Sequence, residues 1–513
     1  MLQSANTRTR IGITIPGGTA MDARDGSGAG RAAWGTLLLA ALVALALPVR
    51  AAEPMEPPAE PGPGARMQAL IEQRSPLAND QWGLFDLEKA LAETPERPLL
   101  HRRKGDLLAR QGRHEPALDA YAKALALDPG DFAARVGRAR ALEALGREAE
   151  ASAEYGALLE HFPENAWAHV KRAQAHRRLK EYAQAQAFLV RALEISPRYA
   201  WAYHERGVTF AVAGEWRQAL ADYDRALELD PLWKWSYFRR AEAWEAVGDD
   251  AKAVADYTQA IRRYPRWFAA VQRRGQAHHR LGESEAALAD FTRAIALAPE
   301  QPLTYLLRGD VRYALARYPG AVEDYARAIE LDPGAPRGFQ SRGVAYMALG
   351  EHALAVADFT RALDLEATAP LYVLRGRARR ELDDLAQAEA DFGAAIGLVP
   401  QNPEAFVWRG RVREALDNPA GAEEDFGAAI GLAPQQAEPY VLRGRLRFLG
   451  GDEPGALTDL EEALRLDPEY GLAYFLRGRL HARRDAPERA RADWARACRL
   501  KVVLACAWVE GDA

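Results

Sequence analysis

The chain has 513 residues, 49% of them hydrophobic and 27% charged, a composition that is ordinary for a globular protein. Its formal net charge of -5 shows no basic excess, so nothing here indicates nucleic acid as a partner. The two cysteines lie near the C-terminus, which excludes a cysteine-rich scaffold, and the ten histidines form no metal-binding motif. No nucleophile elbow or phosphate-binding loop occurs, so we expect no cofactor, no metal and no catalysis.

The N-terminal segment has the pattern of a secretory leader. Two arginines precede an apolar run over residues 32–47, and Val49 and Ala51 follow with the spacing of a cleavage site. We interpret residues 1–52 as a signal peptide or leader of an exported bacterial protein, periplasmic or otherwise exported. The alternative is an uncleaved N-terminal anchor, and both place the rest of the chain outside the cytoplasm. After removal of the signal we expect no membrane insertion.

Two short segments follow the leader. Residues 53–64 are rich in proline, glutamate and glycine and predict an extended linker with no means of packing. Residues 65–97 include the stretch DLEKALAETP, which matches part of the repeat described next. We interpret them as a degenerate N-terminal half-repeat or cap.

Residues 98–504 consist of twelve copies of one pattern at a spacing of 34 residues, with one copy a residue short. The copies begin at residues 98, 132, 166, 200, 234, 268, 302, 336, 369, 403, 437 and 471. Position 20 of the repeat is always alanine, position 8 is glycine or alanine, and position 24 is aromatic or leucine. Each copy predicts two helices joined by a turn, and the small residues let the helices approach closely. One such hairpin cannot bury its apolar face alone, so the copies must stack.

This pattern resembles the tetratricopeptide repeat, which has alanine, aromatic, alanine and proline in the same order. The resemblance implies an all-α fold, a right-handed superhelical solenoid of helix-turn-helix repeats whose first helices line a concave groove. It also implies a non-catalytic scaffold that binds a protein or peptide. The chain departs from the family at position 7, where arginine replaces leucine, and at position 11, where tyrosine is mostly lost.

The arginine at position 7 occurs together with an aspartate at position 23 in the last nine repeats. In the final four repeats the pairs are Arg375 with Asp391, Arg409 with Asp425, Arg443 with Asp459, and Arg477 with Asp493. Two independently solvated charges would not need to recur together. The pattern therefore favours a structural ladder of ion pairs between the packed helices.

A second arginine, at position 9, occurs only in the last four repeats, as Arg377, Arg411, Arg445 and Arg479. Residues two apart on a helix point about 200° apart, so the arginines at positions 7 and 9 cannot share a task. In the resembled family, position 9 faces the groove. The four arginines are either a solvated face of an arginine-rich protein or a stripe that binds an acidic partner.

Three tryptophans, Trp167, Trp201 and Trp235, stand at position 2 of successive repeats, which also faces the groove in the resembled family. An aromatic ladder there can hold apolar side chains of a peptide or the faces of sugar rings. Packing between neighbouring repeats is the competing interpretation.

The expected function is therefore an exported scaffold that holds an extended peptide or a partner protein, acidic in character, in its groove. The alternative is a carbohydrate-handling scaffold for acidic polysaccharide export in the envelope, with an anionic glycan as ligand. Residues 505–513 form a C-terminal tail. A turn between Cys498 and Cys506 would allow a disulfide, whereas a straight helix would hold them about 12 Å apart.

Overall fold

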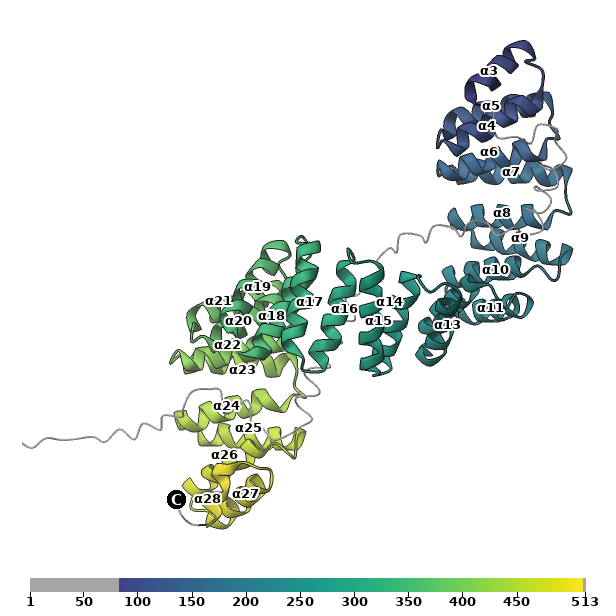
Figure 1. The fold of residues 1–513 in the computed structure, drawn as a ribbon. Helices are drawn as coiled ribbons and strands as arrows, with labels where there is room; N and C mark the ends of the chain where they lie inside the picture. Colours follow the sequence, from purple (N-terminus) through teal and green to yellow (C-terminus); the bar gives the residue numbers. More distant parts are fainter. Residues whose placement is uncertain (1–82, 511–513) are drawn as a thin grey trace, which may run out of the picture. The chain divides into compact units, whose positions relative to one another are not determined.

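The computed structural model describes residues 83–510, which form α-helices and no strand (Figure 1). The leader, the linker and residues 65–82 of the expected N-terminal cap lie outside the described residues. The described chain divides into two compact bodies. The N-terminal body extends to Pro299 and holds α3 to α15, and the C-terminal body begins at Glu300 and holds α16 to α28.

The N-terminal body is a stack of helical hairpins preceded by one helix. The helices are α3 (Leu84–Glu93), α4 (Pro98–Arg110), α5 (His114–Leu127), α6 (Phe132–Ala144), α7 (Glu148–His161), α8 (Ala166–Arg178), α9 (Tyr182–Ile195), α10 (Ala200–Val212), α11 (Trp216–Leu229), α12 (Lys234–Ala246), α13 (Asp250–Arg263), α14 (Phe268–Arg280) and α15 (Ser284–Leu297). Helix α3 buries Leu87 and packs against α4, so it covers the first hairpin as a cap would.

The C-terminal body continues the same alternation. Its helices are α16 (Pro302–Ala314), α17 (Tyr318–Leu331), α18 (Pro336–Leu349), α19 (His352–Leu365), α20 (Ala369–Glu381), α21 (Leu385–Leu398), α22 (Pro403–Ala415), α23 (Pro419–Leu432), α24 (Ala437–Gly450), α25 (Glu453–Leu466), α26 (Gly471–Arg483), α27 (Pro487–Arg499) and α28 (Val503–Glu510). The expected tail is thus helical as far as Glu510. The all-α fold of stacked helix-turn-helix repeats is confirmed.

Close approach between the two helices of a hairpin depends on the small residues. The alanine at position 20 is fully buried in every repeat, as Ala219 and Ala388 illustrate. A Cβ atom added at Gly207, position 8, would lie 2.7 Å from the Tyr223 ring at position 24 of the same repeat. The aromatic ring therefore fills the space that the missing side chain leaves, and this contact sets the helix spacing.

The turn inside each hairpin requires one residue with a positive φ. This residue stands at position 15 and is glycine in seven repeats, for example Gly350 with a φ of 79°. In repeat seven it is Ala316, with a φ of 56°. The left-handed conformation brings the Cβ atom of an L-residue too close to its own backbone, so glycine is favoured there.

This difference gives a stability prediction. Replacing Ala316→Gly should stabilise the chain, and replacing Gly350→Ala should destabilise it, each by about 1 kcal/mol. Urea unfolding followed by far-ultraviolet circular dichroism measures both changes. Shifts of the same sign in the two variants would contradict the proposed role of position 15.

Candidate functional site

All nine arginine and aspartate pairs of positions 7 and 23 are formed, each between the two helices of one hairpin. The Nε and Nη2 atoms of the arginine donate to both carboxylate oxygens, as in Arg206 to Asp222 at 2.8 and 2.7 Å. The other pairs are Arg240 with Asp256, Arg274 with Asp290, Arg308 with Asp324, Arg342 with Asp358, Arg375 with Asp391, Arg409 with Asp425, Arg443 with Asp459, and Arg477 with Asp493. The hydrogen bonds that they donate to the aspartates raise the pKa of Arg206 and Arg477, so these arginines stay charged.

The aspartate of the ladder has further partners that the sequence analysis missed. In α20, Arg379 at position 11 donates from Nη1 to Asp391 at 2.7 Å, and Arg413 of α22 does the same to Asp425 at 3.0 Å. Arg447 and Arg312 repeat this contact in their own hairpins. The sequence contained a signal for this contact, namely an arginine at position 11, one helical turn after position 7. In these four repeats it also accounts for the departure from tyrosine at position 11.

Position 25 links one hairpin to the next. The third guanidinium nitrogen of Arg240, Nη1, donates to Asp224 of the preceding repeat, and Nη1 of Arg274 donates to the Thr258 hydroxyl at 3.0 Å. The position 7 arginine therefore braces its own hairpin and touches the neighbouring one. This use leaves it unavailable for a ligand.

Two of the four arginines at position 9 already have a counter-charge within the chain. Arg411 pairs with Glu438 of the following repeat, and Arg445 pairs with Glu414 of the preceding one. A neighbouring first helix thus supplies a counter-charge to both, and the stripe that binds an acidic partner stays a prediction. The guanidinium of Arg377 lies over the Trp408 ring, 5.0 Å from its centroid.

The three tryptophans at position 2 are half-buried and pack against other aromatic rings. Their partners are Tyr155 for Trp167, Tyr199 for Trp201 and Trp267 for Trp235, with centroids 5.9, 5.9 and 4.5 Å apart. The Nε1 atom of Trp201 also donates to Glu205 at 3.0 Å. These contacts agree with packing in and between repeats.

A cavity of about 580 Å³ opens on the first helices α10, α12 and α14 of the N-terminal body. Its lining is Val208, Ala211, Val212, Trp216, Tyr223, Arg239, Glu242, Glu245, Ala246, Arg273 and Arg280. Valine and alanine side chains meet Trp216 on one side, and ion pairs stand on the other. Most of these residues occupy positions 6, 9, 12 and 13, where small side chains in α10 were the signal that the sequence analysis did not use.

The ion pairs that line the cavity differ in length, and the one between Arg273 and Glu245 is long. Arg239 binds Glu242 at 2.8 Å, whereas the nearest nitrogen of Arg273 lies 3.6 Å from Glu245. Glu245 accepts a hydrogen bond from the Tyr257 hydroxyl at 2.7 Å. The Arg273 side chain is 43% exposed, so it can turn toward a ligand without breaking a hydrogen bond to Glu245.

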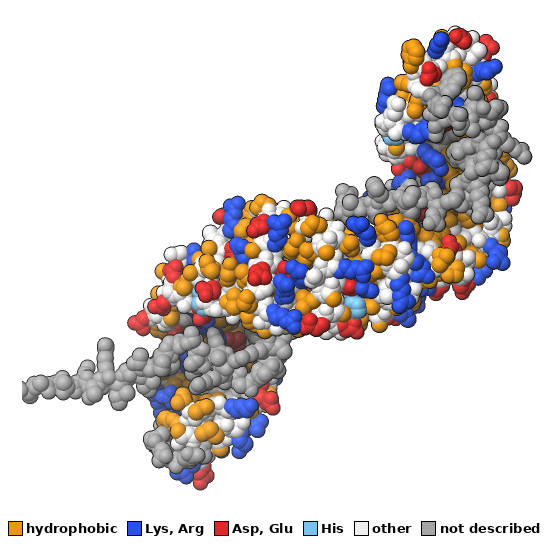
Figure 2. Space-filling view, in the orientation of Figure 1, with side chains coloured by type: hydrophobic (Ala, Val, Ile, Leu, Met, Phe, Trp, Pro, Cys, Tyr) orange, Lys and Arg blue, Asp and Glu red, His pale blue; other side chains and the backbone are white. Residues whose placement is uncertain are grey.

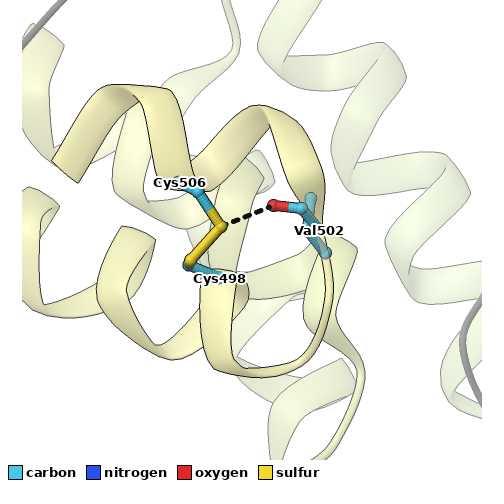
Figure 3. Close-up of a disulfide and its surroundings, with 3 residues drawn as sticks. All are labelled: Cys498, Val502 and Cys506. Carbon is cyan, nitrogen blue, oxygen red and sulfur yellow. Dashed lines mark hydrogen bonds between the residues drawn. A yellow bond between two sulfur atoms is a disulfide. The ribbon is translucent and has the colours of Figure 1, made fainter. Parts of the chain in front are cut away.

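The C-terminal cysteines are joined in a disulfide (Figure 3). Helix α27 ends at Arg499, and a turn at residues 500–502 leads into α28, which places the two Cα atoms 4.8 Å apart. The bridge holds α28 against α27 at the end of the C-terminal body. No helix within residues 83–510 has both the length and the apolar character that a membrane crossing requires.

Sequence comparisons agree with this architecture. Family models described as tetratricopeptide repeat match residues 108–175, 168–199, 200–233, 238–302, 336–368, 373–437 and 442–500. A further model, described as TPR repeat, matches residues 309–350. The chain belongs to the tetratricopeptide repeat family. Its repeats are those of a family whose members are scaffolds for protein–protein interaction.

Several solved structures are similar to this tetratricopeptide repeat chain. MamA is 26% identical over 31% of this chain and 94% of its own, with a TM-score of 0.31. YrrB, a TPR protein with an unusual peptide-binding site, is 22% identical over 38% of this chain and 97% of its own, with a TM-score of 0.32. The APC/C hetero-tetramer Cut9-Hcn1 is 16% identical over 87% and 94%, with a TM-score of 0.39. No curated protein matches. None of these likenesses identifies a ligand for this chain.

The two arginines that flank Gly410 provide a matched test of the ladder. Arg409→Gln leaves Asp425, whose side chain is 3% exposed, with an incomplete set of donors, and should cost about 2 kcal/mol of unfolding free energy. Arg411→Gln removes a pair with Glu438, which is 38% exposed, and should cost less than about 1 kcal/mol. Urea unfolding of both variants measures the difference. Equal losses would show that the buried pair has no special role.

Proposed function

We propose that this protein is an exported, non-catalytic scaffold that binds an extended peptide or a partner protein along the surface of its first helices. The observation that carries the proposal is the cavity on α10, α12 and α14. It combines apolar side chains with charged groups that converge from three successive repeats. A concave site of this composition suits a peptide, because apolar contacts provide affinity and a few polar groups set orientation.

The cavity favours a ligand with two kinds of group. Val212 is 54% exposed and, with Val208 and Trp216, offers an apolar contact for one side chain of the peptide. Arg273 stands across the same cavity and is the group best placed to meet a carboxylate or a backbone carbonyl. The cavity would thus bind a short peptide segment in which an apolar residue lies near an acidic or polar one.

The arginine stripe of repeats nine to twelve forms a second part of the proposal. An acidic partner that approached Arg411 or Arg445 would compete with Glu438 and Glu414 for these arginines. They therefore contribute less to binding affinity than arginines without a counter-charge would. On the face of Figure 2, basic and acidic side chains are interspersed. The packed tryptophans leave the carbohydrate alternative without an observation in its favour, and we therefore propose a protein ligand.

A peptide-display selection tests the cavity. The chain without its leader should enrich a consensus peptide, and Val212→Glu should weaken binding of that peptide at least about tenfold, because it puts a charge into an apolar contact. Val190→Glu is the matched control, since Val190 lies on the second helix α9 and is 43% exposed. Selected peptides that bind both variants equally well would place the ligand elsewhere.

Export is the remaining part of the proposal. It rests on the leader pattern of residues 1–52, and the disulfide between Cys498 and Cys506 supports it because such bonds persist in oxidising compartments. N-terminal sequencing of the protein from an envelope fraction should begin near Ala52. Full-length chain recovered from the cytosol with two reduced cysteines would contradict export.

A further inference from the structure

Position 12 of a repeat faces arginines of the next first helix, and three interfaces show a glutamate there. The pairs are Glu143 with Arg178, Glu245 with Arg280, and Glu414 with Arg445. In the first two the arginine stands at position 13 of the following repeat, and in the third it stands at position 9. In these three interfaces, a carboxylate at position 12 neutralises an arginine at position 9 or 13 of the next repeat.

The interface between α24 and α26 breaks this pattern. Position 12 of α24 is Phe448, whereas positions 9 and 13 of the following repeat are both arginine, Arg479 and Arg483. Their guanidinium carbons lie 5.1 and 4.2 Å from the centroid of the Phe448 ring. Two cations converge on a place where three other interfaces carry a carboxylate.

Among residues 83–508, whose side chains the structure describes, no carboxylate pairs with either of these arginines. Arg483 donates one long hydrogen bond, 3.4 Å, to the carbonyl oxygen of Phe448. Burial and the nearby charge of Arg483 lower the pKa of Arg479, whereas hydrogen bonds to Asp493 raise the pKa of Arg477 on the same helix. Arg479 and Arg483 thus repel each other with no counter-charge between them.

We propose that Arg479 and Arg483 over Phe448 form a binding site for a carboxylate of an acidic peptide, which supplies the charge that glutamate supplies elsewhere. The site rests on the proposed function, because it places one contact of the ligand on the first-helix surface. The phenyl ring, 1% exposed, orients both guanidiniums through cation–π contacts. Their N–H groups then donate to the carboxylate with the planar geometry that guanidinium favours. An aspartate or glutamate side chain and a C-terminal carboxylate share this chemistry.

Fluorescence anisotropy with labelled hexaglutamate and the full chain tests the site. Saturable binding should weaken at least about tenfold in Arg479→Gln and in Arg483→Gln, since each loses a charge-assisted hydrogen bond. It should also weaken as salt screens the charges.

The control is Arg465→Gln on the second helix α25, whose charge Glu462 already meets, and its affinity should stay within about twofold of wild type. Hexaglutamate with an amidated C-terminus separates a terminal carboxylate from side-chain carboxylates as the source.

A second pair of variants replaces Phe448, once with a carboxylate of the chain itself and once with a neutral side chain. Phe448→Glu places a carboxylate where Glu143, Glu245 and Glu414 stand and should abolish hexaglutamate binding. Phe448→Gln removes the same ring without adding charge and should retain more of the binding, with circular dichroism confirming that both variants fold. Equal binding by wild type and Arg479→Gln, or by the two Phe448 variants, would overturn the site. So would the lack of saturable binding by wild type, even where the display selection on α10, α12 and α14 succeeds.

Discussion

The buried ion pair between positions 7 and 23 is the interaction on which the last nine hairpins depend. A carboxylate such as Asp425, with 3% of its side chain exposed, loses nearly all of its hydration when the hairpin closes. Two parallel hydrogen bonds from one guanidinium replace that hydration with fixed geometry. Removal of the arginine would leave a desolvated charge, so the pair acts more as a condition for correct helix pairing than as an added source of stability.

This brace is possible only because the helices are close. Glycine or alanine at position 8 and alanine at position 20 bring the backbones together, and the ring at position 24 fills the remaining space. Arginine at position 7 then reaches across the hairpin in place of the leucine typical of the family. Arginine at position 11, as in Arg379 and Arg413, reaches the same aspartate in place of tyrosine. Where position 11 is arginine, the two departures from the family pattern therefore serve the same aspartate.

With the hairpins braced internally, the exposed positions of the first helices can vary. In the N-terminal body, small side chains at positions 9, 12 and 13 leave the cavity lined by Val208 and Val212. In the C-terminal body, the same positions carry arginines that lie over Trp408 and Phe448. One repeat pattern thus supports two different chemistries on its first-helix surface, which is the property that a scaffold for a specific partner requires.

The sequence by itself determined the repeat boundaries, the helical hairpins and the pairs of positions 7 and 23. These follow from contacts within one repeat, where a constant separation of 16 residues makes a recurring partner visible. The pairing of Arg411 with Glu438 and of Arg445 with Glu414, the cavity, and the packing of the tryptophans were decided by the tertiary structure. Such contacts join different repeats, and their partners change from one interface to the next. Only the stacking geometry decides whether an arginine at position 9 meets a glutamate or the ring of Phe448, because charge and distance act through space and not along the chain.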